Sequence, residues 1–145
     1  MPKRLTLGAD ERLKREKDLE TLFRQGKAFS VFPLKLIWLL TAPRAGEEKV
    51  CVKAAFTAPK KKFRKAVQRN RVKRLLRESW RLQKNILCDA VPAGKQLHVF
   101  LIFTGATLPS YAEVFSAVQK GMERLLRALQ QANGELAVSP EMPAS

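Results

Sequence analysis

Residues 60–84 constrain the fold more than any other part of the chain. This segment, KKKFRKAVQRNRVKRLLRESWRLQK, holds 12 lysine or arginine residues and one acidic residue, Glu78, which gives it a net charge of +11. The whole chain has 28 basic and 13 acidic residues and a net charge of +15, so all other residues together contribute only +4. Charge this concentrated indicates a cationic surface on one element, and such a surface fits a polyanion.

The same segment has the periodicity of an amphipathic helix that begins near Ala66. At about 100° per residue, apolar and polar side chains fall on opposite sides. The side expected to be buried holds Val72, Leu75, Leu76, Ser79, Leu82 and Ile86. The side expected to be displayed holds Asn70, Lys73, Arg74, Arg77, Arg81 and Lys84, with Arg69 and Arg71 at its edges.

Three other segments have the patterns of β-strands. Residues 34–41 form a short apolar run, residues 49–58 alternate with period two until Pro59, and residues 96–104 alternate again. Runs of this length and pattern favour strands, either half-buried or buried.

Two further helices complete the predicted elements. Asp18 and Gly26 are suited to begin and end a short helix, and Ser110 with Glu113 has the spacing of a capping box that begins a long one. The order of elements predicts a single-domain α+β or split-βαβ sandwich, with helices against one sheet. The domain is expected to cover residues 1–133, and residues 134–145 are expected to form a flexible acidic tail.

Composition limits the classes of protein to which the chain can belong. Its 145 residues suffice for one domain with a core, and 46% of them are hydrophobic, which is too many for a disordered chain. No apolar run approaches the roughly 20 residues that span a bilayer, and no signal peptide is apparent. Cys51 and Cys88 form no CxxC pair, and with a cytoplasmic localisation expected, we predict reduced core thiols in preference to a disulfide.

No pattern in the sequence predicts catalysis by protein side chains. His98, the single histidine, lies inside a predicted strand, where a structural role is the simpler interpretation. No His, Cys, Asp or Glu cluster has metal-ligand spacing, and no glycine-rich phosphate loop is present. We therefore predict no catalytic residue and no metal site in the chain itself.

The basic helix has two interpretations, a solvated charged face or a nucleic-acid-binding face. Solvated helices usually mix signs and gain from oppositely charged pairs four residues apart. Here Arg77 has like-charged neighbours at that spacing on both sides, Lys73 and Arg81. Arginine also binds phosphate with its planar fork and stacks on bases, so nucleic-acid binding is favoured.

A second candidate surface combines apolar and basic residues. Its members come from the short first helix, the first strand and the start of the basic segment: Leu19, Phe23, Ile37, Trp38, Lys60, Lys61 and Lys62. Core packing explains the apolar members equally well. The functional alternative is a platform on which single-stranded RNA stacks its bases beside cations.

The run AVQRNRVKRLLRE at residues 66–78 resembles the signature of the protein subunit of bacterial ribonuclease P. Arg12-Leu13-Lys14 is similar to a second family motif, and the order of elements fits the family over roughly residues 12–129. The resemblance implies a fold with a four-stranded sheet, three helices and a left-handed βαβ crossover. It also implies an endoribonuclease that removes the 5′ leader from precursor tRNA, with the catalytic centre and its Mg²⁺ held by a catalytic RNA subunit.

The resemblance further implies roles for individual residues. The RNA-subunit face would comprise Arg69, Asn70, Arg71, Lys73, Arg74 and Arg77, continued along the helix by Arg81. The cleft for the single-stranded leader would comprise Leu19, Phe23, Ile37, Trp38, Lys60, Lys61 and Lys62. Neither a membrane nor an obligate protein partner is expected. Two alternatives stay open, a ribosomal or other structural RNA-binding protein and a DNA-binding protein that places the basic helix in a major groove.

Overall fold

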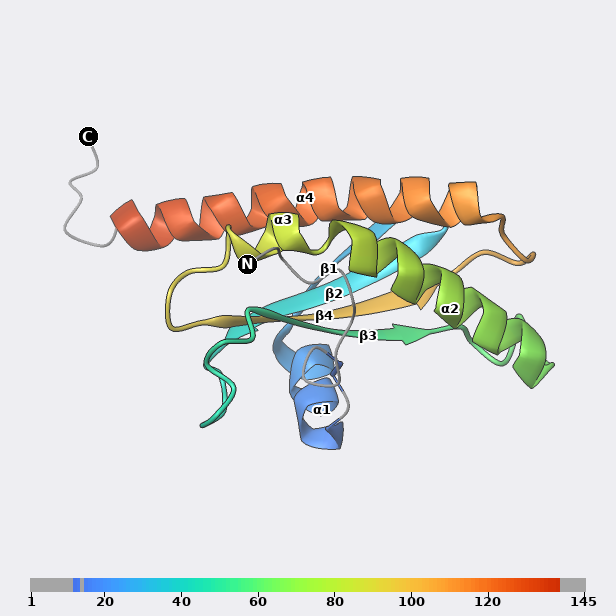
Figure 1. Ribbon diagram of the computed structural model, residues 1–145, viewed down its shortest axis with the longest axis horizontal. Helices are drawn as coiled ribbons and strands as arrows, with labels where there is room; N and C mark the ends of the chain where they lie inside the picture. Colours follow the sequence, from blue (N-terminus) through green and yellow to red (C-terminus); the bar gives the residue numbers. More distant parts are fainter. Residues whose placement is uncertain (1–11, 14, 139–145) are drawn as a thin grey trace.

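A four-stranded mixed sheet lies between helices on both of its faces in the computed structural model, which describes residues 12, 13 and 15–138. Helices α2, α3 and α4 cover one face, and the short helix α1 lies against the other (Figure 1). In chain order the elements are α1 Glu16–Gln25, β1 Lys27–Val31, β2 Leu34–Thr41, β3 Val52–Thr57, α2 Ala66–Gln83, α3 Asn85–Cys88, β4 Gln96–Phe103 and α4 Tyr111–Val138.

The strand order in the sheet is β1-β2-β4-β3. Strand β2 pairs antiparallel with both β1 and β4, whereas β3 pairs parallel with β4. Parallel neighbours need a crossover connection, and here α2 supplies it. Because β3 and β4 are direct neighbours, no strand separates them, and the split form of the predicted βαβ unit is wrong; the left-handed crossover stays a prediction from the resemblance.

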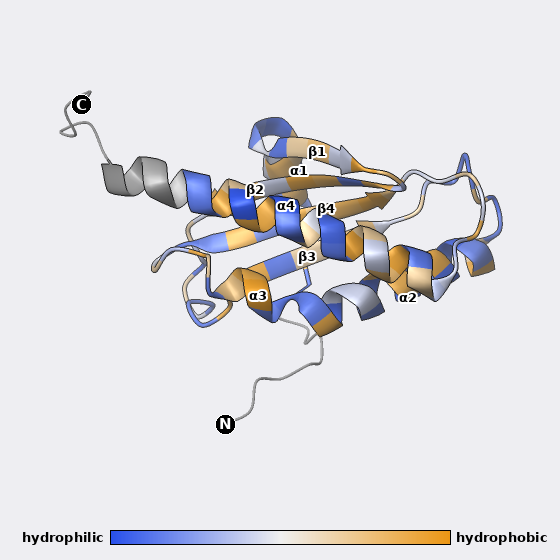
Figure 2. Cartoon of the chain, turned by 90° about the horizontal axis from the view of Figure 1, so that it is seen from above, coloured by the Kyte–Doolittle hydropathy of each residue, from blue (hydrophilic) through white to orange (hydrophobic). Residues whose placement is uncertain are grey.

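The main core lies between the sheet and the helices α2 and α4. Leu36, Val99 and Leu101 of the sheet are fully buried there, together with residues of both helices such as Leu76 and Leu125. Figure 2 shows hydrophilic and hydrophobic residues alternating along α4, as expected for a helix with one face in the core. This packing fixes α2 on the outside of the sandwich.

A smaller core lies between α1 and the opposite face of the sheet. Leu13, Leu22 and Ile37 are buried in it, with half-buried Phe100 and Ile102 at its edge. A glycine is required where α1 meets β2, because a Cβ atom on Gly26 would collide with the carbonyl oxygen of Leu22. The sheet is therefore apolar on both faces, but α1 covers only part of the second one.

The predicted boundaries hold for β2 and for the start of α2, and β4 ends one residue before the predicted strand. Strand β3 begins at Val52 and not at residue 49, because turns precede it, in which the N–H groups of Glu47 and Val50 bond to the carbonyls of Arg44 and Glu47. The short strand β1 was not predicted.

Helix α4 continues past Gly134 to Val138, so the first five residues of the predicted tail are helical, and its flexibility stays a prediction. Residues 139–145 lie outside the described part of the chain.

Cys51 and Cys88 form a disulfide with a Cα–Cα distance of 5.4 Å, so the prediction of two free thiols is wrong. Cys51 precedes β3, and its carbonyl accepts the N–H of Leu97 at 2.9 Å. Cys88 ends α3, which follows the basic helix. The crossover brings these two points together across 37 residues, a proximity that spacing in the sequence does not reveal.

Candidate nucleic-acid interface

Helix α2 buries a stripe centred on Val72, Leu76, Ser79 and Trp80. At the C-terminal end of the segment, the observed buried side differs from the side that the sequence predicts to be buried. Leu82 is 39% and Ile86 54% exposed, whereas Lys84 is buried. The helix ends at Gln83 and a separate short helix follows, so the 3.6-residue period cannot be extended to Ile86.

The outer side of α2 carries exposed cations around a shallow depression. Asn70, Arg71 and Arg74 are exposed, and together with Val67 and Leu75 they line a hollow of about 540 Å³. Val67 is 79% exposed, so the hollow offers an apolar contact among donors. Side chains of this kind can contact a phosphate backbone and a sugar or base beside it.

A second depression lies where α2 meets the edge of the sheet. Arg12, Lys73 and Arg77 line a pocket of about 210 Å³ against β3. The N–H of Leu13 donates to the carbonyl of Ala54 at 2.9 Å, which holds Arg12 beside the helix. No acidic residue lines this pocket within the described part of the chain. Arg12 comes from a segment about 60 residues before Lys73 and Arg77 in the chain. Together these three cations extend the basic face beyond α2. We call Arg12, Asn70, Arg71, Lys73, Arg74 and Arg77 the helix surface.

Two predicted members of this face have protein partners. The Nη1 atom of Arg69 donates to the carbonyls of Phe63 at 2.9 Å and Arg64 at 2.8 Å. Arg81 forms an ion pair with Glu78, donating from Nε to Oε2 at 3.1 Å, and this hydrogen bond lowers the pKa of the Glu78 carboxyl. Arg81 therefore adds little net charge to the surface.

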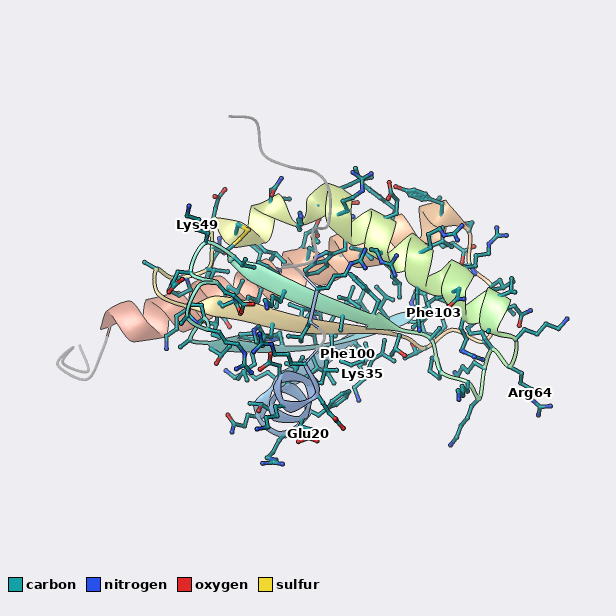
Figure 3. The ribbon with its side chains drawn as sticks, turned by 60° about the horizontal axis from the view of Figure 1, so that its bottom comes forward. Glu20, Lys35, Lys49, Arg64, Phe100 and Phe103 are labelled. Carbon is teal, nitrogen blue, oxygen red and sulfur yellow. A yellow bond between two sulfur atoms is a disulfide. The ribbon has the colours of Figure 1, made fainter. Side chains whose placement is uncertain are left out.

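On the opposite face of the molecule, Phe23 projects from α1 beside the sheet. Its side chain is 54% exposed, and its ring centroid lies 5.1 Å from that of Phe100 in β4. Leu19 is half-buried and Ile37 is buried beneath the helix. Figure 3 shows Phe100 and Lys35 beside α1 on this side of the sheet.

Trp38 does not belong to this surface, which corrects its predicted position. Its side chain faces the main core and is only 6% exposed, with Lys27 Nζ 5.6 Å from the ring centroid. Adjacent residues of a strand face opposite sides, so Ile37 and Trp38 could not both line one cleft.

The lysines at 60–62 come three residues after the end of β3 and lie at the end of this surface. Thr57 pairs with Ile102, and Ile102 pairs with Lys35, so the chain leaves the sheet beside these residues. Lys62 Nζ donates to the carbonyl of Thr104 at 2.7 Å. We call residues 60–64 the lysine loop.

We call Leu19, Phe23, Lys35, Phe100 and Ile102 the α1 surface. Sequence reasoning missed Lys35, Phe100 and Ile102. The available signal was the second apolar face of the strand at 96–104, which indicates either a covering helix or an exposed platform.

His98 belongs to a hydrogen-bond network with a structural role. His98 is buried, and its Nε2 lies 2.7 Å from Oε1 of Gln96, whose amide donates to the carbonyl of Val50. Burial lowers the pKa of the His98 imidazole. Among the described residues, no group of three or more His, Cys, Asp or Glu is placed to hold a metal ion. Within the same part of the chain, no helix is long and apolar enough to cross a membrane.

Comparison with known proteins gives a consistent result. A family model described as Ribonuclease P matches residues 7–126. The ribonuclease P protein component of Porphyromonas gingivalis is 38% identical over 127 residues, covering 86% of this chain and 89% of the relative. That of Chlorobaculum tepidum is 41% identical over 83 residues, covering 56% of this chain and 54% of the relative.

Two solved structures share the fold. The ribonuclease P protein of Staphylococcus aureus aligns with a TM-score of 0.61 at 16% identity, over 79% of this chain and 94% of that protein. The ribonuclease P protein of Thermotoga maritima aligns with a TM-score of 0.61 at 19% identity, over 79% and 96%. Together with the family match, these findings show that the chain belongs to the ribonuclease P protein family, as a component that assists the ribonuclease P RNA in processing the 5′ end of precursor tRNA.

Proposed function

We propose that this chain assists the RNA through two surfaces on opposite sides of one sheet. The helix surface binds the ribonuclease P RNA, and the α1 surface with the lysine loop binds the single-stranded 5′ leader of precursor tRNA. The chain supplies binding and positioning, and the RNA supplies the catalytic centre with its Mg²⁺.

The observation that carries the leader assignment is the position of Phe23. Its ring is more than half exposed, yet it is supported by Phe100 at 5.1 Å, so it offers a flat apolar face that the protein itself leaves uncovered. Only unpaired bases can stack on such a ring, because the bases of a duplex already stack on each other. Lys35 lies beside this face, and the lysine loop lies farther along, at the end of the sheet next to Thr104. In both places the cations could neutralise the leader phosphates.

The helix surface is suited to a different ligand. Its residues are mostly cations on a rigid helix, with Arg12 added from the N-terminal segment and no exposed aromatic ring among them. A rigid cationic face favours the backbone and shape of folded RNA over the bases of a flexible strand. This difference in chemistry supports separate partners for the two surfaces.

Reconstitution with the cognate RNA tests the proposal. We expect Phe23→Ala to weaken binding of precursor tRNA by the assembled enzyme, by about 1–3 kcal/mol if one stacked base is lost. Binding of mature tRNA, which has no leader, should hardly change. Arg74→Ala should instead weaken assembly with the RNA subunit and leave the ratio of precursor to mature affinity unchanged.

Two controls make the result interpretable. Phe23→Ala must keep the circular dichroism spectrum of the parent and stay fully folded under the assay conditions, since a general loss of stability would weaken every interaction. The chain without RNA, incubated with precursor tRNA and Mg²⁺, should give no cleavage. Equal losses of precursor and mature affinity in the folded Phe23→Ala variant would contradict the leader assignment.

A further inference from the structure

The lysine loop needs external support to hold one shape. Three lysines and Arg64 are exposed within five residues, and Lys65 follows directly, so five like charges repel one another. Figure 3 shows Arg64 at this end of the molecule, pointing away from the sheet. Without fixed contacts, a segment of this charge would extend into solvent and sample many conformations.

Besides the hydrogen bond from Lys62 Nζ to the carbonyl of Thr104 at 2.7 Å, three attachments hold the loop. The N–H groups of Lys62 and Phe63 donate to the carbonyl of Pro59 at 3.2 Å, forming a turn. The Phe63 ring is buried, 5.8 Å from the ring of Phe103. The third attachment is Arg69, which reaches back from the first turn of α2 to two loop carbonyls.

Arg69 differs from its neighbours on the helix in what its guanidinium contacts. Both hydrogen atoms of Nη1 are engaged, at 2.9 Å to Phe63 and 2.8 Å to Arg64, and the residue is half-buried. Arg71 and Arg74 are exposed and line the hollow of the helix surface. Hydrogen bonds from a charged donor are stronger than neutral ones, so these two contacts fix the loop to the start of α2.

We propose that Arg69 is a positioning residue, which holds the lysine loop in place for the 5′ leader and does not contact the phosphates of the RNA subunit. This proposal rests on the proposed function, in which the lysine loop neutralises the leader. It assigns Arg69 to the leader side of the reaction, although Arg69 lies on the same helix as the residues that bind the catalytic RNA.

The test compares Arg69→Ala, Arg69→Lys and the matched control Arg71→Ala. Hydrogen exchange of the Lys62 and Phe63 amides in the full-length chain reports the order of the loop. The ratio of precursor to mature tRNA affinity in the reconstituted enzyme reports leader binding. The dependence of RNA-subunit affinity on salt concentration counts the phosphate contacts.

We expect both Arg69 variants to accelerate loop exchange and to reduce the preference for precursor tRNA by about tenfold, the scale of a lost charge-assisted hydrogen bond. Lysine keeps the charge but lacks the planar fork, so it should not restore the loop. The slope of log affinity against log salt should stay unchanged in both, whereas Arg71→Ala should lower it by about 0.7–0.9.

The proposal is overturned if Arg69→Ala lowers the salt slope as much as Arg71→Ala while the loop amides keep their protection. It is also overturned if the loop loosens without loss of precursor preference, in an enzyme where Lys61→Ala does reduce that preference. If Lys61→Ala has no effect on the preference, the assignment of the loop to the leader fails, and the exchange data alone decide whether Arg69 holds the loop.

Discussion

Ile37 and Trp38 are adjacent in the sequence but lie on opposite faces of β2. Ile37 packs under α1, and Trp38 packs in the main core with the residues beneath α2 and α4. Phe23 remains exposed on the α1 side. At the scale of single residues, the two aromatic side chains predicted for the leader cleft therefore have different roles. Trp38 stabilises the fold, and Phe23 is available to a ligand.

Substitution of each aromatic residue should separate these roles. Trp38→Ala removes a buried ring and should lower the free energy of unfolding by about 3–5 kcal/mol. Phe23→Ala, at a half-exposed position, should cost about 1 kcal/mol or less. Urea unfolding followed by circular dichroism measures both values, and similar losses in the two variants would contradict the assigned positions.

The pH dependence of stability should depend on His98. Burial lowers the pKa of its imidazole, so the unfolded chain binds a proton more readily than the folded one. The free energy of unfolding should therefore fall as pH decreases below about 6.5, the usual histidine value, and His98 should have no effect well above it.

Unfolding by urea between pH 5 and 7.5 tests this expectation, with His98→Gln as the comparison. Glutamine does not titrate, so the variant should lose less stability on acidification than the parent. Parallel pH profiles for the two proteins would show that His98 is not responsible.

Among the elements, α2 carries the charge that we propose binds RNA, but not all of its cations serve equally. Arg74 and Arg77 line depressions that have no acidic residue in their described lining, while Arg69 and Arg81 bond to protein groups. Each phosphate that a cation neutralises releases counterions and adds to the salt dependence of binding.

Arg74→Ala combined with Arg77→Ala should reduce the slope of log affinity against log salt by about one to two units for RNA-subunit binding. Lys120→Ala with Arg127→Ala is the matched control, because both residues are exposed on α4. Arg124 is unsuitable as a control, since it donates to the carbonyl of Ser30 at 2.9 Å and lies over the Phe29 ring. An equal reduction from the control pair would mean that binding follows net charge and not the helix surface.

The individual elements were predictable where local periodicity decides the structure. The run at 34–41 became β2 without any change of boundary, and α2 begins at Ala66 as its apolar spacing predicts. The signature around Asn70 also indicated the family and the basic face. These features depend on residues a few positions apart, which a single sequence displays directly.

Features that depend on distant residues were not predictable in this way. The burial of Lys84, the placement of Trp38 away from α1 and the disulfide between Cys51 and Cys88 all depend on which elements pack together. The position of Arg12 beside Arg77 requires pairing of the N-terminal segment with the edge of β3. Periodicity gives the buried side of an element but not the partner that covers it.

At the scale of the whole molecule, the disulfide connects the two ends of the crossover that carries α2. It closes a loop of 37 residues between the start of β3 and the end of α3. Cross-linking across such a loop stabilises a protein mainly by restricting the unfolded chain. The cross-link therefore contributes to the stability of the sandwich, and neither cysteine is a member of the two proposed RNA-binding surfaces.

Reduction of this disulfide should lower the free energy of unfolding by about 3–4 kcal/mol, the value expected for a loop of this length. Urea unfolding with and without a thiol reductant measures the difference. The variant Cys51→Ala with Cys88→Ala is the control and should not respond to the reductant. A reductant effect of the same size in this variant would show that the disulfide is not its cause.

Because the two proposed surfaces lie on opposite sides of the sheet, the molecule can bind two RNAs at the same time, one on each side (Figure 1). In the proposed function, the helix surface contacts the ribonuclease P RNA and the α1 surface contacts the precursor tRNA. A photo-crosslinking amino acid placed at residue 23 or residue 74 of the reconstituted complex with precursor tRNA tests this claim most directly. We predict that residue 23 crosslinks to the 5′ leader and residue 74 to the RNA subunit; crosslinking of both positions to the same RNA would contradict the account.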